Sequence, residues 1–269
     1  MTFSNSKIES IHRSVRESNP LVHCLTNSVV QEITADVLLA AGASPAMVSH
    51  PEECEQFAAV ASALLVNVGN PDPPVIEAMR SAVKVVRSQE KPWVLDPVAV
   101  GGLSIRTELA VSLLSAHPTV IRANASEILN LHYAVNQVKA GGGRGVDSTD
   151  SPEAAVESAQ ALAELTGGVV AISGATDIIV SSGRITRVSG GSTLMPLVIG
   201  TGCSLGATVA AYTAAWDDAH EATVAAHALY STAAEWAEPL SAGPGTFHSH
   251  WIDGLFAQLP NTATVKDGQ

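Results

Sequence analysis

A glycine-rich segment at residues 200–206, GTGCSLG, offers the clearest chemistry in this sequence. It directly precedes a strongly apolar stretch that is predicted to form a helix. Glycines let the backbone curl there, so the free N–H groups of the first helical turn converge. The helix dipole adds about half a positive charge. Gly200, Thr201, Gly202 and Cys203 are therefore predicted to form an anion hole suited to a transferring phosphoryl group.

Two alternatives accompany this motif. The segment could instead be an ordinary glycine-rich start of a helix that binds no anion. It matches neither the GxxxxGK[ST] phosphate-binding loop nor the GxGxxG dinucleotide fingerprint. Cys203 stands in the first turn, where the dipole is expected to lower its thiol pKa and make it a base or nucleophile. The other interpretation of Cys203 is a small buried side chain that packs behind the loop.

Two further candidate groups follow predicted strands. Asp96, in VLDPV, stands at the carboxyl end of one strand, where ligands of open α/β sheets bind, and Pro97 forces the chain out of that strand. The run RANASE at 122–127 places Arg122, able to grip phosphates, near Glu127, able to hold Mg²⁺. Surface caps or ion pairs are the alternative for each group.

The segments HCLTNS at 23–28 and GASPAM at 42–47 have the same strand-end character. Asn27 is a candidate cap of the following helix. Met47 is either core filler or a flexible contact for an apolar heterocycle. The nine histidines lack HxxxH or HExxH spacing, so none is assigned to a metal.

These groups need a scaffold, and the hydrophobic pattern predicts one α/β domain over residues 1–269. Short β-branched runs alternate with stretches rich in Ala, Leu and Val, as in βαβ units on a mostly parallel sheet. The predicted strands are 21–25, 63–68, 93–95, 119–121, 169–173, 178–180 and 185–188, with a hairpin turn at 181–183. The predicted helices are 29–41, 51–61, 75–88, 109–115, 152–165, 203–217 and 219–236. KAGGGRGVDSTDS at 139–151 suits a long active-site loop.

Composition limits the possible partners. Of 269 residues, 46% are hydrophobic and 15% charged, which supports a sizeable core. The formal net charge of −12 argues against nucleic acid and anionic membranes as partners. Any phosphate ligand must therefore be held by helix N-termini, backbone N–H groups or metal ions. With no apolar leader, no run of about 18 apolar residues and three cysteines without CxxC spacing, we expect a cytoplasmic protein.

Six ordered segments together resemble the hydroxyethylthiazole kinase family, thiamine-salvage enzymes of the ribokinase-like superfamily. They are PLVHCLTN at 20–27, GASPAM at 42–47, LDPVAVG at 95–101, IRANASE at 121–127, GVDS at 145–148 and GTGC at 200–203. The resemblance spans most of the chain. It implies a ribokinase-like fold, ATP- and Mg²⁺-dependent phosphorylation of the primary alcohol of 4-methyl-5-(2-hydroxyethyl)thiazole, and a homotrimer with thiazole sites between subunits.

The resemblance also implies roles on the nucleotide side. Carried over by position, Arg122 and Ser173 contact ATP, and Asp96 and Glu127 serve Mg²⁺. Ser173 replaces the family's usual threonine and Ala123 its usual glycine, so the details of nucleotide contact differ from the family pattern.

On the acceptor side, the resemblance implies that Asn27 and Met47 line the thiazole pocket and that Gly200 contributes to the substrate site. Cys203 falls where many ribokinase-like enzymes place an aspartate base. Residues 197–199 read LVI where the family often has Lys-Val-Thr, which removes a possible basic and hydroxyl contribution.

Three other functions remain open at this point. A related kinase could act on another small alcohol, such as a hydroxymethylpyrimidine, although Cys203 and residues 42–47 favour the thiazole. A cysteine hydrolase built on Cys203 would need a histidine held by Asp or Asn. A silent nucleotide-binding or structural subunit would keep the anion hole without turnover.

Overall fold

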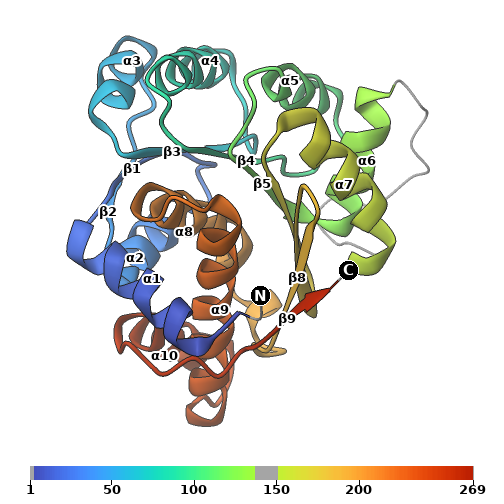
Figure 1. The fold of residues 1–269 in the computed structure, drawn as a ribbon. Helices are drawn as coiled ribbons and strands as arrows, with labels where there is room; N and C mark the ends of the chain where they lie inside the picture. The colour runs from blue at the N-terminus through green and yellow to red at the C-terminus, as the bar shows by residue number, and fades with distance from the viewer. Residues whose placement is uncertain (1–2, 137–150, 269) are drawn as a thin grey trace.

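One nine-stranded sheet runs through the computed structural model, which describes residues 3–136 and 151–268 (Figure 1). The strand order is β2-β1-β3-β4-β5-β6-β7-β8-β9. Neighbouring strands from β2 to β6 are parallel, and β6 to β9 pair antiparallel. The strands are β1 (Leu21–Leu25), β2 (Ser44–Ala46), β3 (Ala63–Asn67), β4 (Trp93–Asp96), β5 (Val120–Asn124), β6 (Val169–Ser173), β7 (Thr176–Ser181), β8 (Arg184–Ser189) and β9 (Thr264–Gly268).

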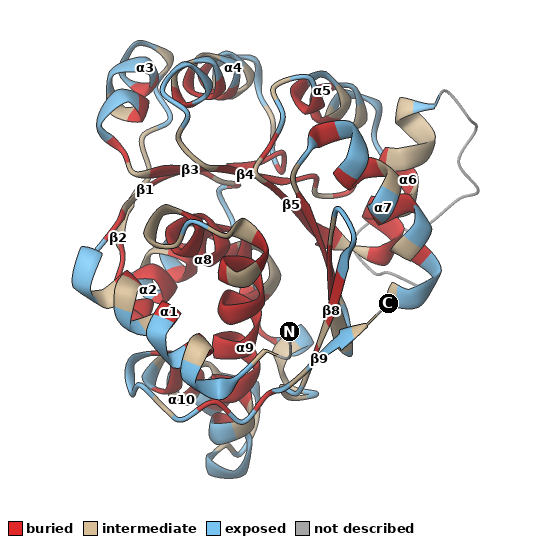
Figure 2. Ribbon diagram, viewed as in Figure 1, coloured by how far each residue is buried: buried red, intermediate tan, exposed pale blue. Residues whose placement is uncertain are grey.

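Helices cover both faces of the sheet (Figure 1). One face carries α3 (Pro51–Val60), α4 (Pro73–Ser88), α5 (Ser104–Leu114), α6 (Ala125–Val135) and α7 (Val156–Thr166). The other carries α1 (Asn5–Ser18), α2 (Gln31–Ala41), α8 (Thr201–Ala215), α9 (Ala219–Ala237) and α10 (Pro244–Phe256). Three 3-10 turns lie at Pro152–Ala155, Met195–Leu197 and Glu238–Leu240. Two-sided cover explains why the parallel strands are almost continuously apolar and buried (Figure 2).

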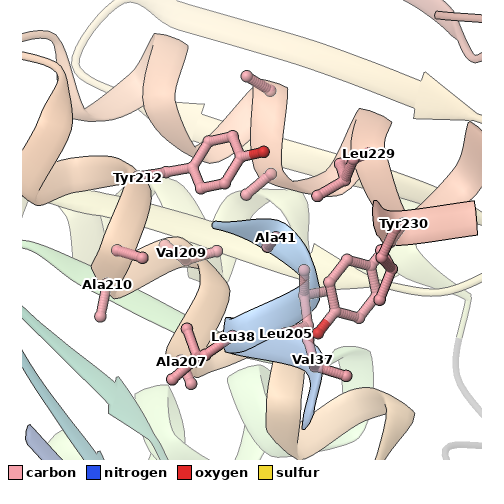
Figure 3. Close-up of a cluster of buried hydrophobic side chains, with 14 of the residues drawn as sticks. Val37, Leu38, Ala41, Leu205, Ala207, Val209, Ala210, Tyr212, Leu229 and Tyr230 are labelled. Carbon is pink, nitrogen blue, oxygen red and sulfur yellow. The ribbon is translucent and has the colours of Figure 1, made fainter. Parts of the chain in front are cut away.

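Helix α8 is the central helix of its face. Apolar residues lie all around it, as expected for a helix buried on every side. Figure 3 shows Ala207, Val209 and Ala210 of α8 packed among side chains of α2 and α9. Gly206 allows α8 to approach the sheet, because a Cβ there would lie 3.0 Å from Leu65 Cδ1. This close packing fixes where the N-terminus of α8 meets the strand ends.

The α/β class and the mostly parallel sheet predicted from the sequence are confirmed, as is the β7–β8 hairpin. The helices α1 and α10 and the edge strand β9 were not predicted, and α6 and β2 were anticipated only as a helix after residues 122–127 and as strand-end character at residues 42–47. Helix α8 begins at Thr201 rather than at Cys203. The predicted active-site loop lies outside the described residues except for Ser151, whose hydroxyl caps the turn that follows; the 145–148 motif also lies outside them. Within the described part of the chain, no helix is long and apolar enough to span a membrane.

Candidate active site

A row of five polar side chains crosses neighbouring parallel strands of the sheet at their carboxyl ends. Asn67, Asp96 and Ser173 are the last residues of β3, β4 and β6; Asn27 lies two residues beyond β1, and Arg122 lies within β5. Each side chain contacts the next one in the row. Because ligands of open α/β sheets bind at this edge, the row marks the candidate site.

Asp96 lies at the centre of the row and is 1% exposed. Its Oδ2 accepts a hydrogen bond from Asn67 Nδ2 at 2.8 Å and lies 3.8 Å from Arg122 Nη1. Its Oδ1 is buried and has no hydrogen-bond partner among the described residues. Burial raises the pKa of Asp96, while the nearby guanidinium opposes that rise. Oδ1 is therefore a buried acceptor whose hydrogen-bonding capacity the described residues leave unused.

Arg122 and Ser173 form the other half of the row. The Nε and Nη2 of Arg122 donate to Ser173 Oγ at 3.1 and 2.7 Å. The guanidinium also lies under the start of α8, because a Cβ on Gly202 would be 3.4 Å from Arg122 Nη1. All three residues line one cavity of about 600 Å³, together with Asp177 and Tyr230. The two residues expected to contact ATP therefore share one ligand-sized space.

The anion hole predicted at residues 200–203 lies at the N-terminus of α8. Gly200 precedes the helix with a φ of 90°, and a Cβ there would lie 2.4 Å from Ile33 Cγ2, so glycine is required. The first-turn N–H groups have no intrahelical acceptor. Thr201 and Gly202 border the same cavity as Arg122. The helix end and the guanidinium thus provide positive potential at one place.

Cys203 is half-buried, and its Sγ accepts a hydrogen bond from Asn27 Nδ2 at 3.6 Å. Burial, followed by the negative charge of Asp96, raises the pKa of the Cys203 thiol to about 11. The expectation that the helix dipole lowers this pKa is therefore wrong. Desolvation and a neighbouring carboxylate outweigh the dipole, and the resting thiol keeps its proton at neutral pH.

Glu127 is buried at the start of α6, where its carboxylate closes a capping box. Its Oε2 accepts from the backbone N–H of Asn124 at 3.0 Å, and its Oε1 accepts from that of Ala99 at 2.9 Å. Both carboxylates were expected to be open groups at strand ends, but Asp96 and Glu127 are buried instead. Glu127 joins the loop after β4 to the start of α6.

Asn27 does not cap α2, whose N-cap is Val30. Instead its Oδ1 accepts from the backbone N–H of Val29 at 3.2 Å, and its Nδ2 reaches Asn67 and Cys203. Met47 directly follows the edge strand β2 and packs half-buried against the core. β2 pairs with β1, so the two residues expected at the thiazole lie beyond the ends of adjacent strands.

Two groups in the site were missed from the sequence. Asn67 is the polar residue that ends the apolar run ALLVN, just as Asp96 ends the next strand, but the sequence analysis did not select it. Asp177 accepts from the backbone N–H of Gly174 at 2.9 Å and from Nδ1 of buried His227 at 2.7 Å. These contacts fix the β6–β7 turn beside Ser173, and no local pattern links residues 50 positions apart.

The described residues contain no group of three or more His, Cys, Asp and Glu side chains able to hold a metal ion.

The sequence of this chain is similar to those of known proteins over most of its length. Residues 12–261 match the hydroxyethylthiazole kinase family. The chain is 51% identical to the hydroxyethylthiazole kinase of Corynebacterium glutamicum (strain R) over 257 residues, which cover 94% of each chain. It is 49% identical to that of Shigella boydii serotype 18 over 89% of this chain and 90% of the relative.

Two solved structures have folds similar to that of this chain. The hydroxyethylthiazole kinase protein of Pyrococcus horikoshii OT3 superposes with a TM-score of 0.88 at 32% identity, covering 97% of this chain and 99% of the other. The pyridoxal kinase of Staphylococcus aureus in complex with ADP has a TM-score of 0.66 at 15% identity and covers 93% and 99%. The second likeness concerns the fold alone.

Proposed function

The chain belongs to the hydroxyethylthiazole kinase family, and from that premise we propose that it transfers the γ-phosphoryl group of ATP to the primary alcohol of 4-methyl-5-(2-hydroxyethyl)thiazole, a step of thiamine salvage. The observation that carries this proposal is the row from Asn27 to Ser173. It joins a nucleotide-sized cavity to the N-terminus of α8.

ATP is assigned to the cavity of about 600 Å³ beside Arg122 and Ser173. The guanidinium and the first turn of α8 face the same space, so they can stabilise negative charge on the transferring phosphoryl oxygens. Most of the catalysis then comes from positioning and electrostatics, since phosphoryl transfer needs little covalent chemistry from the protein.

We assign Mg²⁺ to the oxygens of Asp96 and, through intervening water, of Glu127. The free buried Oδ1 of Asp96 fits a hard cation, whereas both oxygens of Glu127 already accept backbone hydrogen bonds. When bound, the ion would neutralise charge on the ATP phosphates. Arg122 beside Asp96 limits the local negative charge, which is consistent with a single carboxylate in direct contact.

The alcohol is assigned to the space near Asn27, Met47 and Gly200, with Cys203 as the acceptor of its hydroxyl proton. The Nδ2 of Asn27 donates to Cys203 Sγ, so the same amide can orient both the thiol and a bound alcohol. Only the thiolate form of Cys203 can accept that proton, and a pKa of about 11 leaves a small thiolate fraction at neutral pH, so its share of catalysis is modest.

The homotrimer is an expectation from the family resemblance, and exposed apolar side chains around Gly200 offer a surface for it. Val29, Leu197 and Ile199 are 65%, 62% and 70% exposed and line a groove of about 520 Å³ with Pro244 and His248. A cluster of exposed aliphatic side chains beside a substrate site is expected to be covered by protein. We propose that a second copy of the chain covers it and completes the thiazole pocket.

The reaction is tested by turnover of purified protein with ATP and Mg²⁺, measured as ADP release and phosphorylated product. Hydroxyethylthiazole should be preferred over hydroxymethylpyrimidine by about tenfold or more in kcat/KM, because a mismatched ring costs roughly 1 to 3 kcal/mol in a fitted pocket. Comparable kcat/KM values for the two alcohols would contradict the assignment, and absence of turnover with any small alcohol would favour a silent subunit.

The metal assignment predicts different outcomes for two carboxylates. Asp96→Asn and Glu127→Gln should both raise the Mg²⁺ concentration needed for half-maximal activity and for ADP binding measured by calorimetry. Glu127→Gln should also lower the free energy of unfolding by about 1 to 3 kcal/mol, because the amide nitrogen would face a backbone N–H donor. Glu157→Gln, an exposed change in α7, serves as the control. Wild-type Mg²⁺ titrations in both variants would refute the assignment.

The base assignment predicts that Cys203→Ala lowers kcat by about 10²-fold, the lower end of general-base effects, with little change in ATP affinity. Wild-type kcat should rise with pH through the neutral range, since the thiolate fraction grows toward the pKa of about 11, whereas the alanine variant should lack that rise. Cys203→Asp should retain activity. An alanine variant at the wild-type rate would show that Cys203 only packs, and an inactive Asp variant would show that its charge repels the γ-phosphate.

The trimer is tested by light scattering after size exclusion, which should give three times the chain mass of 27.7 kDa. Ile199→Lys should shift the protein to smaller species and raise the KM for the alcohol. Leu165→Lys, at an exposed position on α7, is the matched control and should leave both unchanged. A monomeric wild type with full activity would contradict the assignment.

A further inference from the structure

We propose that Asn67, at the carboxyl end of β3, is a positioning residue that holds Asp96 and Asn27 in register for phosphoryl transfer. This inference rests on the proposed function, because it assigns these two neighbours to the metal and to the acceptor alcohol. It adds a residue for which the family resemblance gave no role.

Asn67 uses both ends of its carboxamide. The side chain is fully buried, its Nδ2 donates to Asp96 Oδ2 at 2.8 Å, and its Oδ1 accepts from Asn27 Nδ2 at 3.2 Å. The same Oδ1 also accepts from the backbone N–H of Gly69 at 3.0 Å. Asn67 is therefore the only member of the polar row described here that joins the acceptor side to the buried carboxylate.

The polarity of these contacts fits an amide at position 67. Asp96 needs a donor on its Oδ2, while Asn27 and Gly69 need an acceptor, and the carboxamide of Asn67 supplies both from one planar group. Because Asn67 occupies Oδ2, the Oδ1 of Asp96 is the oxygen left without a partner among the described residues. The orientation of Asn67 thus selects which oxygen of Asp96 is available.

The same amide also fixes Asn27. With its Oδ1 bound to the backbone of Val29, Asn27 can direct its Nδ2 only toward Asn67 and Cys203. The hydrogen bond from Asn27 favours the charged form of the Cys203 thiol. Asn67 therefore contributes to the surroundings of the acceptor hydroxyl through a second residue.

The turn after β3 is shaped to fit the pair of asparagines. A Cβ on Gly69 would lie 2.8 Å from Asn27 Cβ and 2.9 Å from Asn67 Oδ1, distances that a real side chain does not tolerate. Glycine at this position leaves the two amides in contact. Gly69→Ala consequently disturbs the same arrangement from the outside without changing any charge or polar group.

The ATP side of the row has hydrogen bonds of its own. Arg122 bonds to Ser173 through Nε and Nη2, and neither of these residues contacts Asn67 through a hydrogen bond given by the described structure. Arg122 Nη1 does lie 3.8 Å from the Asp96 Oδ2 that Asn67 holds, and Asp96 is assigned to Mg²⁺. A positioning role for Asn67 therefore predicts that catalysis and alcohol binding fall, whereas ATP binding measured without Mg²⁺ changes little.

The sharpest test is Asn67→Asp, which keeps the side-chain shape but places an oxygen where the donor to Asp96 stood. We expect kcat to fall by about 10²-fold, as for a small misplacement of reacting groups, and the KM for hydroxyethylthiazole to rise. The Kd for ATP, measured by calorimetry without Mg²⁺, should stay within about threefold of the wild-type value. Gly69→Ala should give the same separation and provides the test should the Asp variant fail to fold.

Asn261→Asp is the matched control, because Asn261 is also buried and donates through Nδ2, but its partners are Asn5 and Ala263, outside the site. It should keep wild-type kinetics. The inference is overturned if Asn67→Asp and Gly69→Ala keep kcat within about threefold of wild type, or if the Kd for ATP weakens as much as kcat falls. Failure of the proposed function is distinct, because then the wild-type protein itself would neither bind nor phosphorylate the alcohol.

Discussion

Removing the Asp96 carboxylate from water is the constraint on which the rest of the site depends. A buried charge is costly unless hydrogen bonds and an opposite charge compensate for the lost solvent. Asn67 supplies a hydrogen bond, Arg122 supplies the positive charge, and the carboxylate lies close to α8 because Gly206 has no side chain. The Oδ1 of Asp96 accepts no hydrogen bond from the described residues. This oxygen is the one that we assign to Mg²⁺.

The scaffold follows from the same requirement. Parallel strands bring their carboxyl ends to one edge, so residues far apart in the sequence meet there in a fixed order. The apolar α8 packs against β3 and β4 and directs its N-terminus over that edge. Gly200 and Gly202 then leave room for Ile33 and for the Arg122 guanidinium. Negative and positive groups are thereby held next to one another by packing rather than by long flexible side chains.

Much of the site was predictable because polar residues directly follow apolar runs of the chain, as at Asp96, Arg122 and Ser173. The order of the strands was not predictable from these runs, so the contact between Asn67 and Asp96 could not be foreseen. The N-x-x-E spacing of Asn124 and Glu127 is a recognisable capping signal, and a cap was one of the interpretations that the sequence allowed for this group. The pKa of Cys203 depends on burial and on Asp96, both set by tertiary packing. Strand β9 is polar and pairs with β8 alone, so its sequence gave little sign of it.

We propose that the row from Asn27 to Ser173 aligns an alcohol with the γ-phosphate of ATP under the N-terminus of α8. The most direct measurement is a crystal structure of the protein with hydroxyethylthiazole, Mg²⁺ and a non-hydrolysable ATP analogue. We expect the triphosphate to lie beside Arg122 and Gly202 and the alcohol to lie beside Asn27. The hydroxyl oxygen of the alcohol should be about 3 to 3.5 Å from the γ-phosphorus. Nucleotide bound away from Arg122, or an alcohol that does not approach the γ-phosphate, would contradict it.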